Sequence, residues 1–220
     1  MRPTTGVEPR PATGRREIRK QVTRRELLTA GRRLFSEKGL YDSRIEDLTQ
    51  RAGIAKGTLY GYFADKVELV EAVVTSGFDE LGGLVQRNAS GAATRDARVV
   101  AVTRAHLGFF DDNPDLLRVF HQVRGLLKFD LPRWRGLRRV LEHHLEAVAQ
   151  LISRDGTTAD ERARAAAKVL FGSVSGIASV RVSTRAQEPA LADTDATARA
   201  VAAAVITFLD ARGPARAHPR

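Results

Sequence analysis

The amino-acid sequence predicts an all-α fold of about nine helices. Apolar residues recur at steps of three and four along most of the chain, as in Val70, Val74, Phe78, Leu81 and Val85, and this spacing places them on one face of a helix. Alternating apolar and polar runs of useful length are absent, and so are hairpin turn signals. The 220 residues, 43% of them hydrophobic, are enough to bury the core of one large domain or two small ones.

The predicted helices follow in order from local signals. The first covers about residues 16–38, with Leu27, Leu28, Gly31, Leu34 and Phe35 as its buried stripe and Gly39 as its stop. A fourth helix, at about 66–85, is followed by a predicted loop at 86–94. Helices are then expected at about 95–111, 114–127, 132–154, 159–183 and 194–212. Pro114 suits a first helical position, and Thr158 with Glu161 forms a capping box.

Between the first and fourth helices, residues 43–66 contain two short helical patterns around a glycine. Ser43 and Glu46 form the S-x-x-E capping signature of a helix that Gly53 ends. A second helix of two turns or fewer starts at about Lys56. Two helices joined by a short glycine-containing turn form a helix-turn-helix, whose second helix enters the DNA major groove.

The residue order here is more specific than the geometry. Residues 52–63 read AGIAKGTLYGYF and are followed by Asp65-Lys66 and Leu69, and the first helix ends in Leu34-Phe35 and Glu37-Lys38-Gly39. This order, over about residues 16–75, resembles the signature of the tetracycline-repressor (TetR) family of bacterial transcription regulators. The resemblance implies a helix-turn-helix DNA-binding domain at 16–65 and a helical effector-binding and dimerisation domain at 66–212. The fourth helix links them.

The resemblance also implies which residues contact DNA. Thr58, Tyr62 and Lys66 are expected at phosphates, and Ser43 and Arg44 are expected to anchor the preceding helix. Lys56 and Gly57 are expected at base edges, where a lysine bond to guanine O6/N7 is worth ~1–3 kcal/mol of discrimination. Tyr60 is expected at a thymine methyl group or the backbone. Burial in the core is the alternative for Tyr60 and Tyr62. The apolar residues of the motif, Leu48, Ala52, Leu59 and Phe63, are expected to form the small core.

Two residues depart from the usual family pattern. Ala55 stands where a hydroxyl residue usually caps the reading helix, and losing such a cap typically costs ~1 kcal/mol. Thr49 stands where alanine is usual, which predicts slightly different packing of the preceding helix.

Charge is concentrated at the N-terminal end. Residues 1–66 hold 15 Lys and Arg against 8 Asp and Glu, and so carry +7 of the net +10. This predicts a polyanion-binding surface, because a generally arginine-rich composition explains the total but not its concentration. Residues 1–15 are predicted to be a disordered basic arm that either enters a minor groove or only improves solubility. Residues 213–220 are predicted to be a disordered tail.

Several classes of protein are disfavoured. The chain has no cysteine, which excludes disulfides and thiol chemistry. No signal peptide is visible in the first residues, which lack an apolar segment, and the apolar stretches at 169–180 and 201–209 are shorter than the ~20 residues of a membrane span. We therefore expect a soluble cytoplasmic protein with no membrane partner. Neither catalytic motifs nor metal-ligand spacings occur, so an enzyme, a cofactor and a metal site are not expected.

The predicted C-terminal domain is expected to bind a ligand and to dimerise. An unknown small-molecule effector is expected among the middle helices, where aromatic and histidine residues concentrate: His106, Phe109, Phe110, Phe120, His121, Trp134 and His144. Core packing is the alternative for each. A homodimer is expected through small and apolar residues of the last two helices, which otherwise close an intramolecular core: Gly172, Ser173, Gly176, Ser179, Val201, Val205 and Phe208.

These expectations together favour a ligand-responsive transcription regulator. It is expected to be a repressor that binds a palindromic operator in double-stranded DNA as a dimer and is released by its effector. The alternative is a DNA-binding architectural protein that has no effector.

Overall fold

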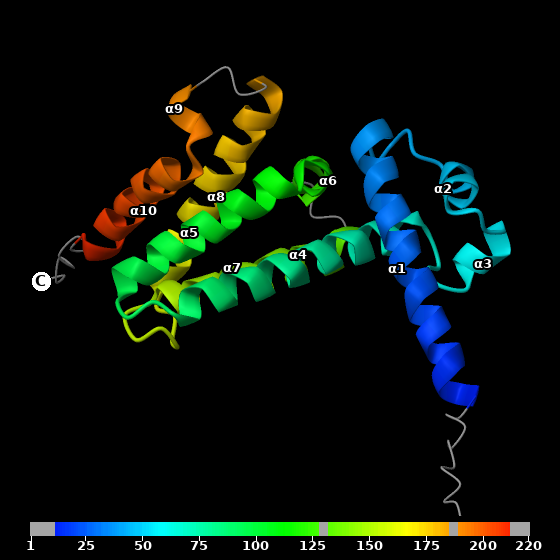
Figure 1. The fold of residues 1–220 in the computed structure, drawn as a ribbon, viewed down its shortest axis with the longest axis horizontal. Helices are drawn as coiled ribbons and strands as arrows, with labels where there is room; N and C mark the ends of the chain where they lie inside the picture. The colour runs from blue at the N-terminus through cyan, green and yellow to red at the C-terminus, as the bar shows by residue number, and fades with distance from the viewer. Residues whose placement is uncertain (1–11, 128–131, 185–188, 212–220) are drawn as a thin grey trace, which may run out of the picture. The chain divides into compact units, whose positions relative to one another are not determined.

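The computed structural model describes residues 12–127, 132–184 and 189–211. Within these ranges the regular structure is entirely helical, which confirms the predicted all-α fold (Figure 1). The described residues form nine helices of five residues or more. They also form the four-residue helix α9 (Pro189–Ala192) and the 3-10 turn η1 (Pro132–Trp134). The predicted tail at 213–220 and most of the predicted arm lie outside the described residues.

The chain forms two compact units that divide between Val73 and Val74. The division falls inside helix α4 (Lys66–Ser90), whereas the sequence suggested a boundary between residues 65 and 66. Helix α4 therefore contributes buried residues to both units.

The N-terminal unit contains α1 (Ala12–Lys38), α2 (Ile45–Ala52), α3 (Lys56–Tyr60) and the first two turns of α4. Gly39 ends α1 with a positive φ of 84°, and its N–H donates to the Phe35 carbonyl at 3.0 Å. The predicted glycine stop is confirmed. The core consists of large side chains from all four helices and from the segment between α3 and α4, each at most 2% exposed: Leu27, Leu34, Phe35, Leu48, Leu59, Phe63 and Leu69.

Helix α1 starts earlier than the sequence suggested. It begins at Ala12 rather than about residue 16, so the last residues of the predicted arm belong to a helix. Its first turns project without packing, because Ile18 and Val22 are 58% and 44% exposed. Local helix propensity, and not core burial, accounts for helix here.

The C-terminal unit is a bundle in which α8 (Glu161–Thr184) packs one face against four other helices. Helix α8 contacts α5 (Arg95–Asp112), α6 (Pro114–Leu127), α7 (Arg135–Ile152) and α10 (Thr194–Asp210) (Figure 1). Ala166, Leu170 and Val174 of α8 have no solvent exposure. By length and composition alone α8 is apolar enough to cross a membrane, but a helix that packs in the core of a helical bundle can have the same composition.

Three sequence predictions about helix ends in this unit are wrong. The expected loop at 86–94 is too long, since α4 continues to Ser90 with Val85 and Ala89 both 1% exposed. The expected helix at 132–154 is divided into η1 and α7. Helix α8 is capped by Asp160, whose carboxylate accepts from the Ala163 N–H at 2.7 Å, and not by a box at Thr158.

Candidate functional site

The turn between α2 and α3 has the geometry that the glycine predicted. Gly53 ends α2 at φ 63°, and the N–H groups of Gly53 and Ile54 donate to the last carbonyls of α2, those of Gln50 and Thr49. Helix α3 then starts after Ala55, which provides no side-chain cap, as predicted. The reading helix is therefore short and uncapped, and its position depends on the buried side chain of Leu59, which is 1% exposed.

The start of α2 differs from its prediction. The Ser43 hydroxyl donates to the Gly39 carbonyl, and the residue at the cap position is Arg44. Its N–H donates to the Asp47 carboxylate at 3.2 Å. The predicted Ser43–Glu46 capping box is wrong by one residue. Ser43 is only 3% exposed, so its side chain is engaged inside the protein, while Arg44 is exposed.

Helix α3 exposes the residues that were predicted to read DNA. Lys56, Gly57, Thr58 and Tyr60 are all exposed, and the 47% exposure of Tyr60 excludes its core alternative. Tyr62 is half-buried. A Cβ atom added at Gly57 would meet no atom within 4 Å. Packing within the protein therefore does not require glycine at this position, which leaves room for a partner to approach the backbone closely.

Both lysines of this surface already have partners. The Lys56 ammonium lies 2.5 Å from the Glu46 carboxylate, and this contact lowers the pKa of Glu46 and raises the pKa of Lys56. The pair is exposed and therefore exchangeable. Lys66 donates to the Ser43 carbonyl at 2.6 Å, and its burial lowers its pKa. Lys66 thus fixes the segment before α2 to the first turn of α4.

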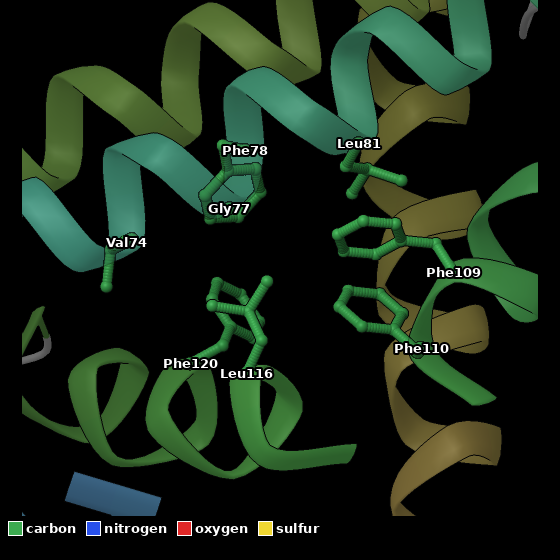
Figure 2. Close-up of a pocket in the computed structure, with 8 residues that line it drawn as sticks. All are labelled: Val74, Gly77, Phe78, Leu81, Phe109, Phe110, Leu116 and Phe120. Atoms are coloured by element: carbon green, nitrogen blue, oxygen red, sulfur yellow. The ribbon is translucent and has the colours of Figure 1, made fainter. Parts of the chain in front are cut away.

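A second candidate site lies inside the C-terminal unit. A cavity of about 10 Å³ is lined by side chains of α4, α5 and α6. Figure 2 shows them converging on one space: Val74, Gly77, Phe78, Leu81, Phe109, Phe110, Leu116 and Phe120. All are apolar, and a volume of this size holds one water molecule at most. The site is closed to any organic molecule in this conformation.

Gly77 allows two of these helices to approach closely. A Cβ atom built at Gly77 would lie 2.4 Å from Leu116 Cδ2 and 2.7 Å from Cδ1. Because real Cβ atoms do not approach carbon so closely, the side chain of Leu116 occupies the space that any other residue at 77 would need. The Leu116 side chain of α6 therefore packs directly against the α4 backbone at Gly77.

A buried histidine pair lies behind the wall of the cavity. The Nε2 atoms of His106 and His144 are 3.0 Å apart, and His106 Nδ1 lies 2.8 Å from the Val102 carbonyl. Burial lowers the pKa of His106 to about 4 and that of His144 to about 3. Both rings are therefore neutral near pH 7. The ring centroid of His144 is 5.0 Å from that of Phe78, which lines the cavity.

The structure brings together only part of the predicted pocket. Phe109, Phe110 and Phe120 line the cavity, whereas His121 and Trp134 do not. The sequence analysis missed Gly77 and Leu116, whose only signal is a glycine inside an apolar helical run. Among the described residues no group of three or more His, Asp or Glu side chains could hold a metal ion.

The predicted dimer residues fall into two groups. Val205 is 1% exposed and packs within the subunit. Gly176 is exposed and Phe208 is 40% exposed, while Gly172, Ser173, Ser179 and Val201 are half-buried. A Cβ atom at Gly172 or Gly176 would meet nothing within 4 Å. An outward face of small and apolar residues therefore runs along α8, and Val169 and Val180 extend it at 44% and 39% exposure.

The fold and the exposed short helix after a glycine turn define a helix-turn-helix DNA-binding protein with a second, helical domain. Residues 27–73 match the family model described as bacterial regulatory proteins, tetR family. The transcriptional activator FasR of Mycolicibacterium smegmatis is 27% identical over 71% of this chain and 72% of its own length. The transcriptional repressor KstR2 of Rhodococcus jostii is 33% identical over 40% of this chain and 43% of its own. Residues 27–73 therefore have the DNA-binding region of the tetR family, and the chain is similar to transcription regulators of that kind.

Solved structures share the fold over most of the chain. FadR from Bacillus subtilis, in complex with stearoyl-CoA, matches with a TM-score of 0.67 at 17% identity, covering 84% of this chain and 97% of its own. FadR from Bacillus halodurans matches with a TM-score of 0.68 at 15% identity, covering 86% and 95%. At these identities the likeness concerns the fold alone.

Proposed function

We propose that this protein is a cytoplasmic, ligand-responsive repressor that binds a palindromic operator as a homodimer and is released by a small-molecule effector. The observation that carries the proposal is the exposure of Lys56, Gly57, Thr58 and Tyr60 on α3, directly after the Gly53 turn. A short helix that exposes one cation, two hydroxyl groups and a bare backbone position matches what the major groove requires.

On DNA, we expect Lys56 to exchange Glu46 for a base or phosphate. The exchange is easy because the pair is solvent-exposed. The hydroxyls of Thr58 and Tyr62 and the guanidinium of Arg44 are proposed to bind phosphates. Lys66 has three donors, and its contacts to the carbonyls of Ser43 and Tyr41 use two of them. Ser43 is proposed to act through this segment and not through its engaged hydroxyl.

Dimerisation is proposed through the outward face of α8 with the exposed part of α10. The face contains Gly172, Gly176 and Val180 of α8 and Phe208 of α10. A Cβ atom at either glycine would meet no neighbouring atom, and the side chains of Val180 and Phe208 are exposed on the isolated subunit. Small residues let helices approach closely, and an exposed apolar stripe favours association. Twofold symmetry would then present two α3 helices to the two half-sites of a palindrome.

The effector is proposed to occupy an enlarged form of the aromatic cavity. The all-apolar lining suits a molecule with an apolar body, and the FadR protein of similar fold was solved with stearoyl-CoA. The present volume of about 10 Å³ favours a second candidate, an effector-independent DNA-binding protein. The two differ in one measurable property, because only the first requires the cavity to open for a ligand.

Fluorescence anisotropy with DNA from upstream of the chain's own gene tests the DNA-binding part. We expect Lys56→Ala to weaken binding by about 5- to 150-fold, the equivalent of a lost base contact. Arg118→Ala, which removes an exposed cation of α6, should leave affinity within about twofold. If binding there is neither sequence-selective nor resistant to moderate salt, the proposal is wrong. A reporter fused to the same DNA must fall in expression when the protein is present, and a rise would identify an activator.

A further inference from the structure

Three histidines of the C-terminal unit contact one aromatic cluster. His106 of α5 and His144 of α7 lie 6.0 and 5.6 Å from the ring centroid of Phe171. His121 of α6 lies 6.0 Å from the ring of Phe120, which is 5.3 Å from that of Phe171. Phenylalanine or leucine at these positions would pack without burying any polar atom. A buried histidine ring, by contrast, has two nitrogen atoms that require hydrogen-bond partners.

The protonation of the His106–His144 pair follows from its partners. A carbonyl only accepts, so His106 Nδ1 carries the proton that bonds to Val102. A neutral His106 then has a bare Nε2, which accepts from His144 Nε2–H across 3.0 Å. His144 has used its single proton in this bond. Its other nitrogen, Nδ1, is therefore a hydrogen-bond acceptor to which no described protein group donates.

His121 leaves an acceptor of the same kind. The Ser175 backbone is its hydrogen-bond partner, and its Nε2 is buried without a partner in the described part of the chain. The Ser175 carbonyl therefore binds Nδ1–H, and the bare Nε2 is an unsatisfied acceptor. The aromatic cluster thus contains one fully buried imidazole acceptor without a partner among the described residues, His121 Nε2, and a second imidazole acceptor, Nδ1 of His144, a residue that is 4% exposed. A ligand that brings a hydrogen-bond donor would satisfy such an acceptor.

Phe78 connects the cavity to this polar group. Its ring lines the cavity and also covers His144 at a centroid distance of 5.0 Å. A ligand that enlarges the cavity by displacing Phe78 would therefore reach His144. Charged ligand groups are disfavoured, because no charged side chain lines the cavity and an unpaired charge there would lose its hydration.

We propose that the effector is an uncharged, largely apolar molecule with a hydroxyl or similar hydrogen-bond donor, and that His144 Nδ1 accepts this hydrogen bond. His106 acts as a positioning residue that fixes the tautomer of His144. The inference rests on the proposed ligand response, and it specifies the chemistry that the ligand must have. It predicts preference for a donor-bearing molecule over an otherwise equal molecule that only accepts.

A matched pair of probes tests the inference. 4-Hexylphenol carries a hydroxyl donor, and 4-hexylanisole has the same apolar body with a methyl ether in its place. Titration calorimetry on the full-length protein should give an affinity about 2- to 12-fold higher for the phenol, the range of one net hydrogen bond. In His144→Phe the ratio should fall to about one, while His143→Phe, an exposed neighbour on α7, should keep it.

A second measurement does not depend on the fold of a variant. In the wild-type protein, the ¹⁵N resonance of His144 Nδ1 should shift on binding 4-hexylphenol and stay in place with 4-hexylanisole. Equal affinities for the two probes, an unchanged ratio in His144→Phe, or a static Nδ1 resonance would overturn the inference. Operator binding is measured on the same sample. If DNA binding holds while neither probe binds, the ligand inference fails alone, and if DNA binding is absent the proposed function fails.

Discussion

Replacing Gly77 by alanine tests how closely α4 and α6 are packed around the cavity. In an exposed helix, glycine to alanine stabilises by about 1 kcal/mol because alanine loses less backbone entropy. At Gly77 the new methyl group would lie 2.4 Å from Leu116 Cδ2 and 2.7 Å from Cδ1. Leu116 is 5% exposed and has little space to move into, since the cavity beside it measures about 10 Å³.

Overpacking of a core typically costs 1–3 kcal/mol, so we expect Gly77→Ala to destabilise by roughly 0–2 kcal/mol after the helix gain is subtracted. Gly82 is the matched control, because it lies on the same helix and a Cβ there meets nothing within 4 Å. Gly82→Ala should stabilise by about 0.5–1 kcal/mol. The difference between the two variants, about 1–3 kcal/mol, measures the packing term alone.

Guanidinium chloride denaturation of both variants gives this difference directly. A double-mutant cycle with Leu116→Ala then attributes the difference to its cause. Leu116→Ala alone should destabilise by about 2–5 kcal/mol, but in that background Gly77→Ala should no longer be harmful. If Gly77→Ala is as stable as Gly82→Ala, or if the cycle is additive, the close approach of α4 and α6 does not limit the packing of this core.

Four further predictions concern the DNA-binding unit, the buried histidine pair and the exposed face of α8. Glu46→Gln should raise operator affinity severalfold at low salt, because Lys56 loses its competing partner; an unchanged affinity would place Lys56 away from DNA. Ala55→Ser should stabilise the N-terminal unit by about 1 kcal/mol through a cap that α3 lacks, measured as a shift in the denaturation midpoint. Acidification from pH 6.5 to 5 should cost roughly 2 kcal/mol for each of His106 and His144, because their pKa values of about 4 and 3 let only the unfolded state bind these protons. That loss should be absent in a double His→Phe variant and should reverse when the pH is raised. Gly176→Arg should give a monomer by light scattering with an unchanged circular dichroism spectrum, and a persistent dimer would exclude the α8 face.

The parts that the sequence predicted well depend on neighbours along the chain. The stop at Gly53, the exposed residues of α3 and the helical periods follow from local backbone chemistry. The start of α2 was misplaced although its signal is local. Ser43 is drawn inward to Gly39 and its carbonyl is held by Lys66, 23 residues away, so Asp47 takes the capping role instead.

The residues of the cavity and of the proposed interface could not be fully predicted, because they are set by contacts between helices that are not visible in the periodicity of one helix. Aromatic residue type identified Phe109, Phe110 and Phe120, but Gly77 matters only because Leu116 of another helix lies against it. Val205 and Phe208 are both apolar and lie on one short helix. Only the packed structure shows that Val205 faces inward while Phe208 is 40% exposed.

Helix α4 sets a limit on how this protein can be divided or recombined. A fragment that ends at Asp65 would lack Leu69, Val70 and Val73, which are at most 2% exposed in the N-terminal unit, and would lose the Lys66 contact to Ser43. The next residue, Val74, and Phe78 one turn beyond it already line the cavity of the other unit. A chimera that joins this DNA-binding unit to a foreign sensor domain therefore has few junctions that leave the buried residues of both units intact. Such a chimera should keep α4 unbroken across the boundary between Val73 and Val74.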